Sequence, residues 1–286
     1  MMKQFHVRRI LTVTLLAAAC AFAQEAAAPA PEPMGWKKNL IGALTLTQNS
    51  YSNWAQGGEN AVAWKGVFET LWENNQPKTN WKNTGKLAYG QVKQGDQEVR
   101  KSDDELRAES VLTYKIGKYV NPYISFNGLT QVANGYDYSN PAVPLVSEAF
   151  DPIFLRQALG LGYKPQENFV TRLGVAVKET IVGTQEFRPL YGNARDENVR
   201  VETGIESVTD FSQKLEENVM FITKLELFTA FEHIEEVDVN WDNTLAAKLG
   251  KYFTVNMNVR LLYDENISKK RQLKQVLGFG VAYTFF

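Results

Sequence analysis

Apolar and polar residues alternate one by one along most of the chain, and this period of two limits its fold more than any other feature. In the segment 253–261 every second residue is apolar, and Asn256, Asn258 and Arg260 lie between. The sequence contains no sustained apolar stripe with a period near 3.6 residues and no run of 18 apolar residues. Such alternation is typical of β-strands that have one apolar and one polar face.

About twelve such segments follow one another, and most of them span ten to fourteen residues. Globular strands most often have about five or six residues, whereas a strand that crosses a membrane at a tilt needs ~9–11. The lengths therefore favour membrane-crossing strands. The predicted strands are 36–47, 60–73, 80–92, 105–116, 119–132, 153–163, 169–180, 199–211, 219–231, 237–249, 252–263 and 271–286.

The connections between successive predicted strands are alternately long and short through the first eight of them. The long ones are 48–59, 93–104, 133–152 and 181–198. Bacterial barrels have short turns at the periplasmic rim and longer loops at the cell surface. The sequence therefore predicts an all-β fold: a transmembrane antiparallel up-and-down β-barrel of about twelve strands over residues 36–286, with the long connections at the surface.

Either face of the strands could point inward. In a soluble barrel the apolar face would have to fill a wide interior, because eight strands already enclose a space that side chains can fill. If the apolar face meets lipid instead, a closed barrel is the only sheet that leaves no backbone group unpaired. We expect the second arrangement, with a polar lumen. The predicted lumen-lining residues are Lys82, Lys86, Arg107, Glu109, Arg172, Lys178, Arg200, Glu202, Glu206, Lys224, Glu226, Asp242 and Arg260.

Aromatic residues favour the lipid-facing arrangement. Trp64 and Trp72 share one side of a predicted strand, eight residues apart, which corresponds to roughly 20 Å along the membrane normal and is close to the apolar band between two aromatic girdles. The last strand places Phe279, Tyr283 and Phe285 on one side. This ending resembles the signal read by the outer-membrane assembly machinery, which the resemblance implies as a partner beside outer-membrane lipid.

The N-terminal region has the pattern of an export signal. Residues 1–23 combine a positive start, an apolar stretch and the small-residue site Ala21-Phe22-Ala23, which predicts cleavage after Ala23. Cys20, the only cysteine, lies inside this signal, and its lipidation is the alternative. Residues 24–35 are rich in Ala and Pro and predict a flexible periplasmic spacer. The predicted location is the bacterial outer membrane.

The stretch SNWAQGGEN at 52–60 carries a resemblance to a known family. With the signal, the Gly-Lys-Tyr turns at 117–119 and 250–252 and the aromatic ending, the chain resembles a Bacteroidetes-type outer-membrane family known only as a domain of unknown function. The resemblance implies a barrel in the outer membrane and no catalytic residue. The loop itself has two interpretations, a structured hairpin or a surface loop that binds a sugar or peptide. Its binding residues would be Asn53, Trp54, Gln56, Gly57 and Gly58.

Few classes of function fit this composition. Charged residues make up 22%, the formal net charge is −1, and no basic run suggests a nucleic-acid partner. The sequence has none of the common hydrolase, phosphate-binding or zinc motifs. His233 is either an exposed turn residue or part of a cation or catalytic site with its acidic neighbours Glu232, Glu235, Glu236 and Asp238.

The sequence thus predicts no enzyme, no metal and no cofactor. The predicted function is a passive pore for small hydrophilic solutes. The alternatives are a structural or partner-binding barrel with a closed lumen, and an outer-membrane hydrolase. Both signs of charge on the predicted lumenal face argue against strong selection of anions or of cations.

Overall fold

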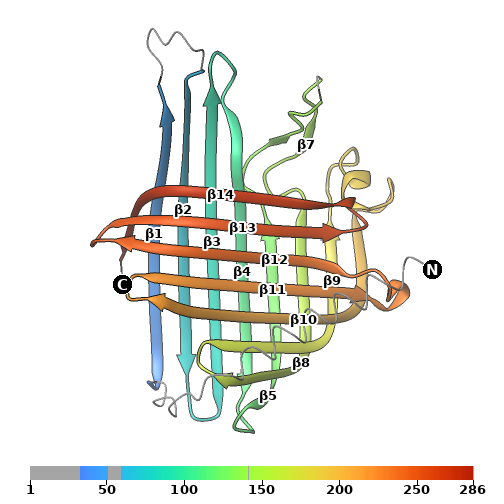
Figure 1. Ribbon diagram of the computed structural model, residues 1–286. Helices are drawn as coiled ribbons and strands as arrows, with labels where there is room; N and C mark the ends of the chain where they lie inside the picture. The colour runs from blue at the N-terminus through green and yellow to red at the C-terminus, as the bar shows by residue number, and fades with distance from the viewer. Residues whose placement is uncertain (1–32, 51–58, 141, 286) are drawn as a thin grey trace, which may run out of the picture. The chain divides into compact units, whose positions relative to one another are not determined.

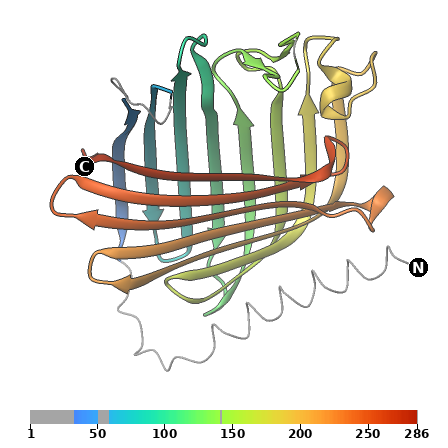
Figure 2. The same cartoon turned by 45° about the horizontal axis from the view of Figure 1, so that its top comes forward.

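The computed structural model describes residues 33–50, 59–140 and 142–285, and these form a closed antiparallel β-barrel (Figures 1 and 2). The predicted signal and nearly all of the predicted spacer lie outside the described residues. No helix within the described ranges is long and apolar enough to span a membrane. The barrel begins at Gly35, one residue before the predicted start.

Twelve strands make the wall, and each pairs with the next around the ring. The predicted all-β transmembrane barrel is therefore confirmed, including its strand number. The strands are β1 (Gly35–Asn49), β2 (Ala61–Asn75), β3 (Thr79–Gln94), β4 (Arg100–Tyr114), β5 (Val120–Thr130), β8 (Ile153–Gln166), β9 (Phe169–Ile181), β10 (Val199–Glu216), β11 (Val219–Ala230), β12 (Asp238–Leu249), β13 (Phe253–Asp264) and β14 (Ser268–Thr284).

Four short elements lie in the connections. A small hairpin, β6 (Gly135–Tyr136) with β7 (Leu145–Ser147), forms between β5 and β8. Two 3₁₀ turns follow, η1 (Arg188–Tyr191) between β9 and β10, and η2 (Phe231–His233) between β11 and β12. All of them lie at the rim where β1, β3 and β5 end.

The barrel closes where β14 returns to β1. The pairing runs from Ile41 opposite Thr284 to Thr45 opposite Gly280, whereas β1 pairs with β2 over its whole length. The strands tilt as barrel closure requires, so that the wall of β10–β14 crosses the wall of β1–β4 at a steep angle in Figure 1. Because the number of strands is even, β1 starts and β14 ends at the same rim.

The two rims differ. At the rim where β1 starts, the strands are joined by turns of two to five residues: 76–78, 115–119, 167–168, 217–218 and 250–252. The opposite rim carries the connections 50–60, 95–99, 131–152, 182–198, 231–237 and 265–267. We call these the short-turn rim and the long-loop rim. The four connections predicted to be long all lie at the long-loop rim.

One predicted long connection is much shorter than expected. The segment 93–104 was predicted to be a loop, but β3 runs to Gln94 and β4 starts at Arg100, which leaves only 95–99. The extra strand residues are mainly charged. Hydrophobic alternation cannot reveal a strand whose two faces are both polar, and here the strand extends beyond the apolar band. For the same reason β10 continues to Glu216 and β14 begins at Ser268.

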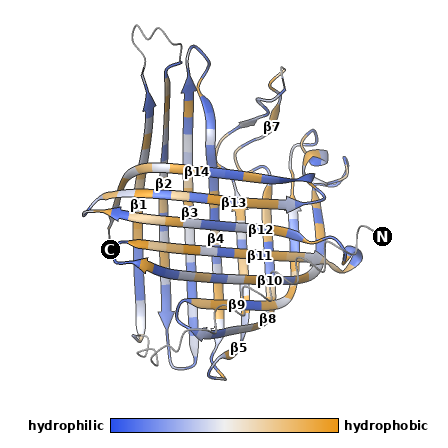
Figure 3. Cartoon of the chain, viewed as in Figure 1, coloured by the Kyte–Doolittle hydropathy of each residue, from blue (hydrophilic) through white to orange (hydrophobic). Residues whose placement is uncertain are grey.

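Apolar and polar residues alternate along the strands of the wall (Figure 3), and the large apolar side chains on its outer face are exposed. Leu159 is 64% exposed and Leu277 74%, values that would be unfavourable in water but suit lipid. Three outward tryptophans donate their indole N–H groups to neighbouring hydroxyls, which gives these donors a partner within the apolar outer surface. These pairs are Trp72 with Thr70 at 2.7 Å, Trp81 with Ser110 at 3.0 Å and Trp241 with Thr223 at 2.9 Å.

Candidate functional site

Strand β4 places a row of charges inside the barrel. Side chains alternate between the two faces of a strand, so Asp103, Glu105, Arg107 and Glu109 all point inward. Apart from Lys86 on the adjacent strand β3, which contacts Glu105 at 3.2 Å, their partners come from strands that are not neighbours of β4 in the ring, so these contacts cross the interior. These inward charges define the centre of the lumen.

A layer of ion pairs crosses the lumen at this level. Arg107 Nη1 lies 3.0 Å from Glu226 Oε1 of β11, and Arg172 Nη2 of β9 lies 2.6 Å from Glu109 Oε1. Lys224 also contacts Glu109, and Arg260 of β13 contacts Glu105. We call Glu105, Arg107, Glu109, Arg172, Lys224, Glu226 and Arg260 the central ion-pair layer.

The charges of this layer are largely buried, and each one is paired with a charge of opposite sign. Only 6% of the Arg172 and Glu226 side chains is exposed. Amides complete the network: Asn240 donates to Glu226, and Arg260 Nε donates to the Asn240 oxygen at 2.9 Å. Burying a charge is tolerated only when partners replace its water. The interior at this level is therefore polar but crossed by side chains.

A small aromatic cluster packs beside the ion-pair layer. Tyr123 and Phe228 are each 2% exposed and pack with Ala158 and Ala176. The Tyr123 hydroxyl donates to Glu206 Oε1 at 3.2 Å. Gly174 makes room for it, because a Cβ there would lie 2.7 Å from the tyrosine oxygen. Aromatic rings thus fill the inward space next to β8 and β9.

A second group of charges lies nearer the long-loop rim. Lys178 Nζ contacts Asp238 at 2.6 Å, Asp264 at 2.8 Å and Glu202 at 3.4 Å, and Arg200 contacts Glu202 at 3.3 Å. These side chains come from β9, β10, β12 and β13. The lumen is therefore crossed by ion pairs at more than one height.

All thirteen residues predicted to line the lumen project from the inward face of the wall. The structure brings most of them into the two charged groups, whereas Lys82 is exposed near the short-turn rim. Sequence reasoning missed Asp103 and Glu105 on β4, and Asp238 and Asp264 on β12 and β13. Glu105 lies inside the predicted strand 105–116 with the parity of Arg107, and the period-two rule finds Asp103 once the strand is extended to Arg100.

Two other predicted features have different outcomes. The loop residues Asn53, Trp54, Gln56, Gly57 and Gly58 lie outside the described residues. His233 is exposed on η2. It forms a group with Glu235 and Glu236 in which the potential metal-ligand atoms, one from each residue, all lie within 4.8 Å of one another. Exposed acidic groups of this kind are common without a metal.

At the long-loop rim, the segment after β5 folds onto the top of β4. The Asp104 carboxylate accepts hydrogen bonds from the backbone N–H groups of Val132 and Ala133, each at 2.9 Å, and from Lys101 Nζ at 2.9 Å. Further along, the Ser139 hydroxyl and N–H both donate to Asp137, which holds the pKa of this carboxyl below its usual range. These bonds fix the shape of the segment.

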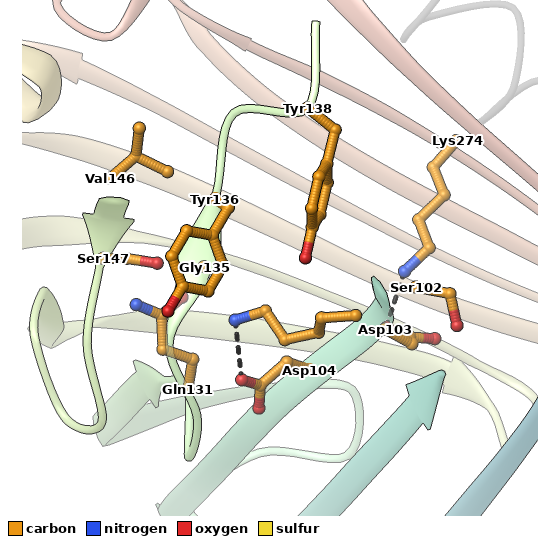
Figure 4. Close-up of a pocket in the computed structure, with 11 residues that line it drawn as sticks. Ser102, Asp103, Asp104, Gln131, Gly135, Tyr136, Tyr138, Val146, Ser147 and Lys274 are labelled. Atoms are coloured by element: carbon orange, nitrogen blue, oxygen red, sulfur yellow. Dashed lines mark hydrogen bonds and ion pairs between the residues drawn. The ribbon is translucent and has the colours of Figure 1, made fainter. Parts of the chain in front are cut away.

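A pocket of about 280 Å³ lies between this segment and the end of β4. Figure 4 shows Tyr136 and Tyr138 bordering it, with Asp104 and Gln131 below them and Lys274 of β14 on the far side. We call it the rim pocket. Its remaining lining residues are Lys101, Ser102, Asp103, Gly135, Val146 and Ser147.

Two family models match different parts of the chain. One, described as a protein of unknown function (DUF3078), matches residues 46–136, and another, described as a protein of unknown function, DUF481, matches 148–285. Both halves belong to one sheet, because β5 pairs with β8 across the junction of the two matches. The expected likeness to families of unknown function is therefore confirmed at that level.

Solved structures with a similar fold are membrane barrels. An outer-membrane channel from Pseudomonas putida F1 is 9% identical, with 91% of this chain and 99% of that chain covered and a TM-score of 0.42. The translocator domain of the autotransporter NalP from Neisseria meningitidis is 8% identical, with coverage of 98% and 97% and a TM-score of 0.37.

The porin KdgM in complex with disordered oligogalacturonate is 11% identical, with 86% and 99% covered and a TM-score of 0.34. These values are too low to support an argument about activity. No match was found among curated proteins.

Proposed function

We propose that the protein is an outer-membrane channel for small hydrophilic solutes in which the central ion-pair layer forms the constriction. The observation that carries this proposal is the distribution of charge: the wall is apolar outside, while both signs of charge project into the lumen. A polar interior suits water and hydrophilic solutes. Because charges of both signs line the lumen and pair with one another, we expect weak selection between anions and cations.

The proposal includes the location and the origin of the chain. Cleavage after Ala23 would release the barrel into the periplasm, and the C-terminal strand would be recognised by the assembly machinery. The long-loop rim would then face the cell surface, and the origin would be of the Bacteroidetes type. We assign no catalytic residue, because the inward carboxylates are held in ion pairs and His233 lies on an exposed turn.

A closed barrel with a structural or partner-binding role is the second candidate. It is favoured by the depth of burial in the lumen, where Glu226 and Arg172 are paired across the interior and Tyr123 and Phe228 are almost inaccessible. The two candidates differ in whether the ion-pair layer leaves a path for ions.

Single-channel recording in a planar bilayer separates the candidates. For a channel, we expect steady conductance steps from the unaltered protein and larger steps from the double variant Arg107→Ser/Glu226→Ser, which removes one crossing pair without leaving a lone charge. Lys82→Gln, exposed at the short-turn rim, is the control and should change the steps little. Steps from the double variant alone would favour the closed barrel. Silence of all three folded proteins would contradict the channel.

A further inference from the structure

The rim pocket presents two aromatic faces on one short segment. Tyr136 and Tyr138 are two residues apart, with ring centroids 6.1 Å apart and planes inclined by 45°. Tyr136 is 41% exposed, and Figure 4 shows both rings beside the same space. Exposed aromatic faces beside polar groups are typical of binding sites, because the ring supplies apolar contact area and the phenol supplies a hydrogen bond.

The charged side chains that line the rim pocket are all held in ion pairs. Lys101 is paired with Asp104 at 2.9 Å, and Asp103 is paired with Lys274 at 2.6 Å and also with Lys65. Two cations and two carboxylates thus line the pocket in balance. Neither an anion nor a cation would find an unpaired charge to replace the water that it loses on binding.

Uncharged polar groups remain available in the pocket. Within the described residues no side-chain hydrogen bond engages the phenol of Tyr136, the phenol of Tyr138 or the hydroxyl of Ser102. Each hydroxyl can donate one hydrogen bond and accept others. A ligand that matches the pocket would therefore be neutral, rich in hydroxyl groups at its edge, and apolar on its faces. A sugar ring has this chemistry.

The pocket also has a suitable size and a fixed shape. Its volume of about 280 Å³ is just below the ~300–1,000 Å³ of common small-molecule sites, which leaves room for one or two sugar rings. The Arg100 guanidinium lies over the Tyr138 ring at 4.8 Å, and Asp104 anchors the segment. A site held in its binding shape loses less entropy when a ligand binds.

We propose that the rim pocket binds a neutral saccharide at the mouth of the barrel. This inference goes beyond the proposed channel, since a sugar can bind at the rim whether or not the lumen conducts ions. Equilibrium binding and conductance therefore test the two proposals separately.

Calorimetric titration of the folded barrel in detergent tests this site. The probes are maltohexaose, cellohexaose, xylohexaose and mannohexaose, with hexagalacturonate as the charged comparison. We expect saturable one-to-one binding of at least one neutral probe. Tyr136→Leu and Tyr138→Leu keep apolar volume but remove the flat faces, and each should weaken that binding about tenfold.

Tyr252→Leu is the matched control, since Tyr252 is an equally exposed tyrosine at the short-turn rim, 44% accessible, and its loss should leave binding unchanged. Heat-dependent gel mobility verifies that each variant is folded. The proposal is overturned if no neutral probe binds, if binding survives both pocket variants, or if hexagalacturonate binds more tightly than every neutral probe.

Discussion

The inner and outer faces of the barrel are built from the same strands but meet opposite environments. Outside, Leu159 and Leu173 are 64% and 60% exposed and meet lipid. Inside, the Arg172 side chain on the same strand as Leu173 is only 6% exposed and is held by Glu109. The outer face is stable because of what surrounds it, whereas the inner face depends on each charge finding its partner. Single changes on the two faces should therefore fail for different reasons.

The largest effect is expected on the inner face, at Glu226. Glu226→Gln keeps the shape but leaves Arg107 and Lys224 without this countercharge, and breaking a buried pair typically costs about 3–5 kcal/mol. Chemical unfolding of the barrel in lipid vesicles measures the loss. A cost below about 1 kcal/mol would mean that water already screens these charges.

A double variant sharpens this result. Arg107→Gln/Glu226→Gln removes both partners, so it should be less destabilised than the sum of the single changes by about 1–3 kcal/mol. Strict additivity would contradict a direct interaction between these side chains across the lumen.

A slightly smaller effect is expected for a new charge on the outer face. Met257 is 48% exposed on the outer face of β13, and its neighbour Asn256 points inward. Met257→Lys should cost about 2–4 kcal/mol, because a lysine near the middle of the bilayer loses its water. Asn256→Lys, at the same height but in the polar interior, should cost much less. Equal costs in the same unfolding assay would show that the two faces are not as different as we describe.

This contrast explains which parts of the fold the sequence could predict. Alternation between lipid and lumen leaves a period of two in strands such as β13, so all twelve strands were found. Where both faces of a strand are polar, the sequence shows no period of two. The start of β4 at Arg100 was missed for that reason. Alternation also has exceptions: Gln157 is a polar residue on the outward parity of β8, although β8 pairs regularly with both neighbours there.

The site was predictable only in part. Parity alone places Arg107 and Glu226 on the inner face, but it cannot show that they meet. That contact depends on the stagger of β4 against β11 on the far side of the ring, which no local pattern records. The rim pocket was missed altogether, because Asp104 and Tyr136 lie in two separate connections, 93–104 and 133–152, that the sequence indicated only as loops.

Loss of a hydrogen bond should also cost more on the inner face than on the outer face, but the change in unfolding free energy should be smaller than for the charges. Tyr123 donates from the buried inner face to Glu206, and Tyr123→Phe should cost about 1 kcal/mol. Tyr89, on the outer face, accepts a hydrogen bond from Gln91 at 3.0 Å. Tyr89→Phe should cost less than Tyr123→Phe, because it leaves no buried carboxylate without a donor. The reverse order of the two unfolding free energies would contradict the buried role of Tyr123.

The smallest effect on stability, and the clearest test of orientation, is expected at the two rims. Asn140→Cys at the long-loop rim and Lys118→Cys at the short-turn rim both alter exposed side chains outside the wall, so neither should change unfolding. If the long-loop rim faces the cell surface, an impermeant thiol reagent will label Asn140→Cys on intact cells. Lys118→Cys will react only after the cells are opened, because the two sites lie at opposite ends of strands that cross the membrane.

The unaltered chain is the blank for background labelling, since its one cysteine, Cys20, lies in the predicted signal. Labelling of Lys118→Cys on intact cells would reverse the orientation and place the rim pocket in the periplasm, where only sugars that had already crossed the outer membrane could reach it.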